Sequence, residues 1–180
     1  MENEESLVRR AQQGDTVALT LIYEDNFDRI YRYIALKIGD RTEAEDLTQQ
    51  VFLNACQSIK GFKFQGMPFS SWLYRIAHNQ IVDYLRKKSR RNTVSLADTD
   101  PPGIDDPARE TEQKMAMEEL AAAAEKLTEA QREVISLRFA AQMPIAEVAR
   151  TMGKTEGAVK ALQHSAVAAL RRIMATEMKL

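Results

Sequence analysis

Apolar residues recur at helical spacing along most of the chain. Between Asp15 and Gly39 they return every three or four positions, which predicts one long amphipathic helix that Asp15 caps and Gly39 ends. A second helix is predicted over residues 42–59, where Thr42 and Glu45 have the spacing of a capping box. The N-terminal part of the chain is therefore expected to be a helical bundle.

Two breaks in this helical pattern divide the chain. Residues 61–71 hold two glycines and a proline and predict an ordered loop, after which a third helix runs to about Lys88. Residues 94–113 contain three of the five prolines, and one arginine against six acidic residues. Such a segment has little apolar surface to bury. We therefore predict a flexible acidic linker over 94–113 between two domains, residues 1–93 and 114–180.

The C-terminal part resumes the helical pattern. Thr128 and Gln131 form a second capping box, and Pro144 suits the first turn of a short helix that Gly153 ends. Thr155 can cap the last helix. A short helix, a glycine turn and a longer second helix predict a helix-turn-helix, and no strand pattern stands out, so the fold class is all-α.

Composition excludes several kinds of function. No apolar run approaches the length of a membrane span, and the first residues are acidic and polar rather than signal-like. The single cysteine, Cys56, is expected to be a small buried residue. With His78 and His164 in different domains, we expect no metal site and no cofactor. Signatures of catalysis are also absent, so the chain is predicted to be a non-enzymatic cytoplasmic protein.

One polar stripe suggests nucleic-acid binding. Five of the six residues from 86 to 91 are basic, and each phosphate that such a run neutralises strengthens binding in a salt-dependent way. The run follows an organised stripe on the helix before it, and the candidate DNA contacts here are Arg75, Asn79, Asp83, Arg86 and Lys87. A solvated helix end is the alternative interpretation.

The loop before this helix adds aromatic side chains to the candidate surface. Bases of single-stranded DNA stack on aromatic rings. Phe69 and Trp72 are expected in the core. Phe64, flanked by Lys63 and Gln65, is the ring we expect to be exposed to a base.

The last helix presents a second candidate DNA surface. Its apolar positions, which include Val159 and Ala166, recur at helical spacing and should face the core. In a helix-turn-helix the N-terminal half of the second helix reads base edges in the major groove. The candidate contacts are Thr155, Glu156, Lys160, Ala161, Gln163 and His164. A helical hairpin without a ligand is the alternative.

A third polar face lies on the predicted helix over 42–59. Glu45, Asp46 and Gln49 make it acidic and rich in amides, beside the apolar Phe52. Taken alone, such a polar face is most simply interpreted as a solvent-exposed helix surface that keeps the protein soluble.

In combination these segments resemble one family. The stretches EAEDLTQQVFLNA, FKFQGMPFSSWLYRIAHNQIVDYLRKK and LTEAQREVISLRFAAQMPIAEVARTMGKTEGAVKALQHSAVAAL, in this order and spacing, resemble a bacterial sigma factor of the extracytoplasmic-function group. The resemblance covers the chain from about Leu7 to Ile173.

The resemblance implies two helical domains, regions 2 and 4, that bind core RNA polymerase and promoter DNA. It implies that Glu45, Asp46, Gln49 and Phe52 dock on the β′ clamp helices, that region 4 contacts the β flap, and that an anti-sigma factor holds the chain inactive. The loop and the stripe from Arg75 to Lys87 would recognise the minus-ten element, and residues from Thr155 to His164 the minus-thirty-five element. We expect a monomer when free.

The sequence departs from the family pattern in the last helix. Ala161, Leu162 and Ser165 stand where relatives often carry arginine or serine, which predicts fewer phosphate contacts. Two other functions stay open, a stand-alone helix-turn-helix regulator and a sigma mimic that binds an anti-sigma factor. The first would not need the acidic face or the loop, and the second should have lost the basic run.

Overall fold

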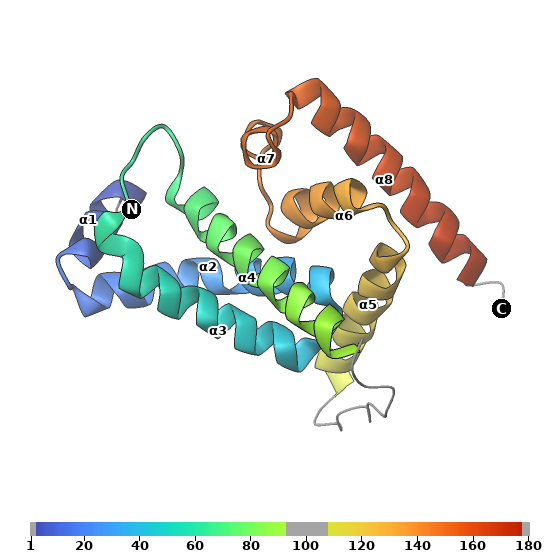
Figure 1. Ribbon diagram of the computed structural model, residues 1–180, viewed down its shortest axis with the longest axis horizontal. Helices are drawn as coiled ribbons and strands as arrows, with labels where there is room; N and C mark the ends of the chain where they lie inside the picture. The colour runs from blue at the N-terminus through green and yellow to red at the C-terminus, as the bar shows by residue number, and fades with distance from the viewer. Residues whose placement is uncertain (1–2, 93–107, 178–180) are drawn as a thin grey trace.

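The computed structural model describes residues 3–92 and 108–177, and every regular element within these ranges is a helix (Figure 1). An N-terminal module holds four α-helices and a C-terminal module holds the helix-turn-helix. The elements in chain order are α1 (Glu4–Gln12), α2 (Thr16–Ile38), α3 (Arg41–Ser58), the 3-10 helix η1 (Ile59–Gly61), α4 (Phe69–Asn92), α5 (Ala108–Glu125), α6 (Glu129–Ile135), the π-helix η2 (Ser136–Ala140), α7 (Ile145–Met152) and α8 (Glu156–Glu177).

Helix α2 is the central element of the N-terminal module. It packs against α1, α3 and α4, and its apolar face is almost fully buried, with Tyr33 and Ile34 at 0% exposure. Helix α4 contributes Leu73 and Ile81 to the same core. Burying each such side chain stabilises the fold by roughly 1.5–3 kcal/mol, so this core fixes how the surface stripes of α3 and α4 are presented.

The predicted limits of α2 are confirmed, but the predicted cap of α3 is wrong. The Asp15 carboxylate accepts from the N–H groups of Val17 and Ala18, and Gly39 ends α2 with a φ of 72°. For α3 the cap is Asp40, whose carboxylate accepts from the Glu43 N–H at 3.0 Å. The helix thus starts at Arg41, and the expected capping box of Thr42 and Glu45 lies inside its first turns.

Two helical segments extend beyond what the pattern predicts. Helix α1 was not predicted; Asn3 caps it, and Val8 and Ala11 are buried. Helix α5 begins at Ala108, so the last residues of the predicted 94–113 linker are helical. The rest of that linker, up to residue 107, lies outside the described residues.

The C-terminal module is built as predicted, apart from one irregularity. The capping box of Thr128 and Gln131 is present, Gly153 ends α7 with a φ of 62°, and the Thr155 hydroxyl accepts from the Ala158 N–H at 3.2 Å. The irregularity is η2, a π-helical turn that continues α6. Such turns are uncommon and often lie at functional positions; here η2 packs against α2, as α5 does.

Within the described ranges, no helix is long and apolar enough to cross a membrane. The same ranges contain no group of three His, Cys, Asp or Glu side chains that could hold a metal ion. Cys56 is exposed, so its predicted place in the core is wrong: it lies on the outer face of α3, one position beyond the buried Ala55.

Candidate nucleic-acid interface

The polar stripe of α4 is presented to solvent. Arg75, Asn79, Asp83 and Arg86 are all exposed, as is Lys87, while the opposite face of the helix is buried in the core. Arg86 lies 3.7 Å from Asp83 as an exposed ion pair. Asp83 therefore orients an arginine, which accounts for an acidic residue within a surface that is otherwise suited to phosphates.

The loop between η1 and α4 is held by an aromatic cluster centred on Phe62. Its ring contacts Phe64 at 4.8 Å, Phe69 at 5.2 Å and Trp72 at 5.2 Å between centroids. Phe64, the ring expected to be exposed, is half-buried, because it packs edge-to-face with Phe62. The residues on either side of it, Lys63 and Gln65, are exposed.

A residue that sequence reasoning missed holds the start of this loop. The side-chain amide of Gln12, at the end of α1, donates to the carbonyls of Ile59 at 2.9 Å and Phe62 at 2.8 Å. Both bonds span nearly fifty residues of sequence, so no local pattern signals them. Helix α1 thereby fixes where the loop leaves the domain.

The exposed face of α8 is smaller than predicted. Thr155, Glu156, Lys160, Ala161 and His164 are exposed near the helix start, and Val159 and Ala166 are fully buried. The remaining candidate is Gln163. It is half-buried, and its side-chain oxygen accepts from the Arg138 guanidinium at 3.0 Å.

Arg138 explains this position of the Gln163 side chain. An arginine only donates hydrogen bonds, so the amide oxygen of Gln163 must face it. The same guanidinium also donates to the Met143 carbonyl. Ser165, one of the departures from the family pattern, is tied in a similar way: its hydroxyl accepts from Gln131 at 2.8 Å. These contacts fix α8 against α6 and η2.

The acidic face of α3 is exposed, except for its apolar member. Glu45, Asp46 and Gln49 are exposed, whereas Phe52 is only 6% exposed and packs against the Tyr23 ring at 4.8 Å. Phe52 therefore belongs to the core between α2 and α3 and cannot contact a partner directly in this state. It supports the helix that carries the three polar residues.

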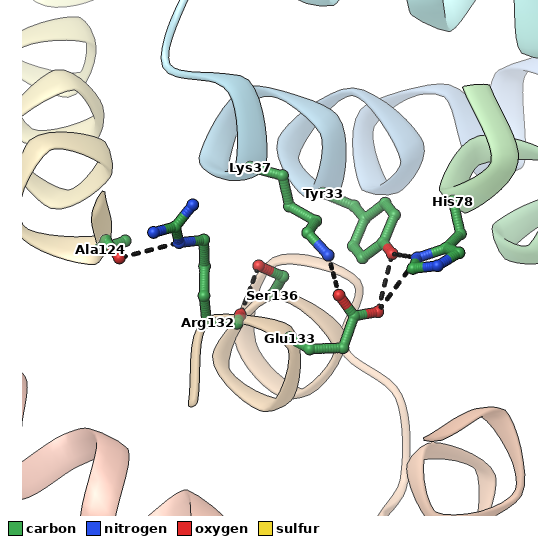
Figure 2. A network of polar contacts seen from close by, with 7 residues as sticks. All are labelled: Tyr33, Lys37, His78, Ala124, Arg132, Glu133 and Ser136. Carbon is green, nitrogen blue, oxygen red and sulfur yellow. Dashed lines mark hydrogen bonds and ion pairs between the residues drawn. The ribbon is translucent and has the colours of Figure 1, made fainter. Parts of the chain in front are cut away.

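The two modules are joined by a polar network around Glu133 of α6 (Figure 2). Its carboxylate accepts from the Lys37 ammonium and, at 2.9 Å, from the Tyr33 hydroxyl, both on α2. His78 of α4 lies 3.8 Å away through its Nδ1. Only 8% of the Lys37 side chain and 12% of that of Glu133 are exposed. This is an ion pair buried between domains.

Further contacts surround this network. The Tyr74 hydroxyl donates to the Ala141 carbonyl at 3.1 Å inside the interface. Arg150 of α7 donates to the Gly66 carbonyl in the loop at 2.9 Å. A cavity of about 610 Å³ lies beside Glu133, and its lining includes Met67, Arg75, His78, Glu129, Glu133, Arg150 and Thr151. The loop and the helix-turn-helix thus share one hollow.

The protonation of two residues in the network depends on burial. Burial lowers the pKa of Lys37 to about 8, against the opposing attraction of the Glu129 carboxylate. Near neutral pH the ammonium therefore still predominates and can pair with Glu133. Burial also lowers the pKa of His78, and the nearby Lys37 charge acts in the same direction. Closure of the interface thus favours a neutral imidazole.

Comparison of the sequence with known protein families identifies the family of the chain. Residues 22–91 match the model of Sigma-70 region 2, and residues 123–172 match that of Sigma-70, region 4. The chain is 36% identical over 170 residues to the ECF RNA polymerase sigma factor BldN of Streptomyces coelicolor. The aligned region covers 93% of this chain but 64% of BldN. The chain thus spans less than two thirds of the length of that relative.

Another relative is matched over nearly its whole length. The ECF RNA polymerase sigma factor SigL of Mycobacterium tuberculosis is 30% identical over 166 residues, 91% of this chain and 93% of SigL. Among solved structures, that of CnrH in complex with the cytosolic domain of CnrY has the same fold, with a TM-score of 0.73 at 21% identity over 96% of this chain and 97% of that one. The chain belongs to the extracytoplasmic-function group of sigma-70 family RNA polymerase sigma factors.

Proposed function

We propose that the chain binds core RNA polymerase and directs it to promoters, where it recognises two DNA elements and initiates transcription. The observation that carries this proposal is that one module exposes both the acidic face of α3 and the basic stripe of α4. A stand-alone DNA-binding regulator needs only the second of these surfaces. The family places such a pair on a factor that links polymerase to DNA.

In this proposal α3 docks on the β′ clamp helices through Glu45, Asp46 and Gln49. The three side chains are exposed and lie on one helix, whose position the buried Phe52 fixes. Region 4 docks on the β flap. Truncating one charged partner in a desolvated interface costs about 2–5 kcal/mol, so these few residues are enough to decide affinity.

The minus-ten element is recognised by the loop and the stripe of α4. Asn79 has donors and an acceptor and can read a base edge, and Phe64, which is only partly buried, can stack on a base. Lys63 and Gln65 flank that ring. Arg75, Arg86 and Lys87 contact phosphates, with Asp83 holding Arg86.

The minus-thirty-five element is recognised by the start of α8. Thr155 and the free N–H groups there suit a phosphate, because the helix dipole favours negative charge. Glu156, Lys160, Ala161 and His164 face the groove. Gln163 lies beside this surface, but its amide is held by Arg138 and is not free to read bases.

The chain is expected to act in the bacterial cytoplasm, as a monomer when free, with an anti-sigma factor as its inhibitor and without enzymatic activity of its own. The anti-sigma partner follows from the family resemblance. Capture of an anti-sigma factor by the purified chain, with core polymerase competing for the binding, would test this part of the proposal.

In vitro transcription tests the main proposal. The purified chain is added to core polymerase on a library of genomic promoter fragments, and transcripts are sequenced. We expect transcripts from a defined promoter class, and an Asp46→Ala, Gln49→Ala double variant should bind core at least about tenfold more weakly with unchanged helical circular dichroism. No transcripts, but specific binding of the chain alone to a palindrome, would instead indicate a helix-turn-helix regulator.

A further inference from the structure

The ion pair between Lys37 and Glu133 is an unusual way to hold two domains together. Removing two charges from water is costly, and their attraction offsets that cost only when both partners are present and well hydrogen-bonded. Here Glu133 has Lys37 on one oxygen and Tyr33 on the other. We call the contacts of Glu133 with Lys37, Tyr33 and His78 the Glu133 latch (Figure 2).

The latch joins surfaces that promoter binding must separate. In the closed state Arg150 of the helix-turn-helix donates to Gly66 in the minus-ten loop, and both modules line one cavity. The minus-ten and minus-thirty-five elements lie about 25 base pairs apart, roughly 80 Å of B-form DNA at about 3.4 Å per base pair. A chain whose loop and helix-turn-helix are in contact cannot bind both elements at once.

The latch also leaves each module able to fold without it. Glu133 extends from α6 toward α2, whereas region 4 also has packing of its own, of α6 and α7 against α8, with Val134, Val148 and Val159 at 0% exposure. The capping box of α6 lies within region 4. Separation would therefore expose Glu133 and Lys37 to water, where each charge is well solvated, without dismantling this valine core.

We propose that the Glu133 latch holds the free chain in a closed, autoinhibited state, and that binding to core polymerase requires the latch to open. The inference rests on the proposed function, because it takes core polymerase as the partner of the chain. Apparent affinity for core is reduced by the fraction of chains that is open. The Glu133 latch sets that open fraction. A substitution of Glu133 therefore alters the affinity for polymerase, although Glu133 is not one of the proposed polymerase or DNA contacts.

The closed state can be measured by the distance between two spin labels. Cys56 is exposed on α3 and serves as one site, and Thr176→Cys at the exposed end of α8 serves as the other. We expect a single, narrow distance distribution in the free chain, because closure fixes the two modules relative to each other. Glu133→Gln keeps the shape of the side chain but leaves the Lys37 ammonium without its counter-charge, so the open population should rise at least about tenfold.

A charge swap shows whether the effect belongs to the pair. Lys37→Glu and Glu133→Lys should each open the chain, and the double variant should close it again. Glu119→Gln, the same change of charge on the exposed surface of α5, should leave the distances unchanged. A compact Glu133→Gln variant, a wild-type chain that is already extended, or a swap that fails to close the chain would overturn the proposal.

The affinity for core polymerase then distinguishes a failure of this inference from a failure of the proposed function. Glu133→Gln should bind core polymerase up to about tenfold more tightly than wild type, because less free energy is needed for opening. Opening without tighter binding would overturn the autoinhibitory role while leaving the sigma function intact. If neither wild type nor variant binds core, the proposed function fails, and the distances still decide whether the latch exists.

Discussion

Helices α4 and α8 carry the two candidate DNA surfaces, and they differ in how freely their polar residues are presented. On α4 the whole predicted stripe is exposed, and the ion pair of Asp83 with Arg86 lies within the helix itself. On α8, the half-buried Gln163 is held by Arg138 and the exposed Ser165 is bonded to Gln131, so two polar positions are engaged by neighbouring elements.

The difference follows from how the two helices are packed. One face of α4 rests on a core of large side chains, which separates its polar stripe from neighbouring elements. Helix α8 packs against α6, and Arg138 of η2 and Gln131 of α6 carry long polar side chains that reach Gln163 and Ser165. A polar helix position is therefore available to a partner only where no side chain of a neighbouring helix already holds it.

The largest effect should come from the basic end of the α4 surface. Replacing Arg86 and Lys87 together by alanine removes two phosphate contacts, so promoter affinity of the holoenzyme should fall by about tenfold and the salt slope by about 1.8. Filter binding over a range of salt concentrations measures both. The ranking of minus-ten sequences should not change; a changed ranking would mean that these residues read bases.

An effect confined to one base position is expected at Asn79, which lies in the middle of the same stripe. Asn79→Ala should relax the preference at one minus-ten position by about 1–3 kcal/mol, because the variant cannot pair with a base edge. Selection from a randomised minus-ten library measures this. Asp83→Ala is the matched control: it frees Arg86 and should weaken all sequences alike. Equal behaviour of the two variants would contradict the division of roles within the stripe.

On α8 the difference in presentation predicts that substitutions at Lys160 and Gln163 have different effects. Lys160→Ala should change the selected minus-thirty-five sequence, since Lys160 is exposed toward the groove. Gln163→Ala should instead lower the free energy of unfolding of region 4 by about 1 kcal/mol, because Arg138 loses a hydrogen bond. Sequence selection and urea denaturation distinguish them. A relaxed base preference with unchanged stability in Gln163→Ala would restore Gln163 as a reader.

The smallest effect should be a pH dependence of domain closure. The pKa of His78 is lowered in the closed state by burial and by Lys37, so closure is favoured above the ordinary histidine pKa and is weakened as pH falls below about 6.5. Glu129, Glu133 and Tyr33 also face this site. Lys37, with a pKa of about 8, remains largely protonated between pH 5.5 and 7 and contributes little to the change.

Spin-label distances between pH 7 and about 5.5 would measure this dependence, with the open fraction expected to rise a few-fold. His78→Gln removes the titrating group and should make the profile flat. A wild-type profile that is already flat would exclude His78 as the group responsible.

Much of the fold was predictable because its signals are local. Asp15, Thr128 and Thr155 cap helices within three residues of themselves, and the apolar repeat of α8 predicted which residues are buried. The predictions that failed did so for different reasons. Phe52 is buried because Tyr23 and Phe27, from another helix, pack on it, whereas Phe64 is half-buried because Phe62, two positions away, packs on it in the folded loop.

By itself the sequence determined the all-helical fold class, the caps of α2, α6 and α8, the helix-turn-helix and the order of motifs that places the chain in its family, since each is set by residues a few positions apart. Only the tertiary structure decided that Gln12 holds the loop, that Arg138 fixes Gln163, and that Glu133 meets Lys37 across 96 residues. A periodic pattern identifies the face of a helix that is polar. Which partner a buried charge on that face meets depends on how the helices are packed against one another.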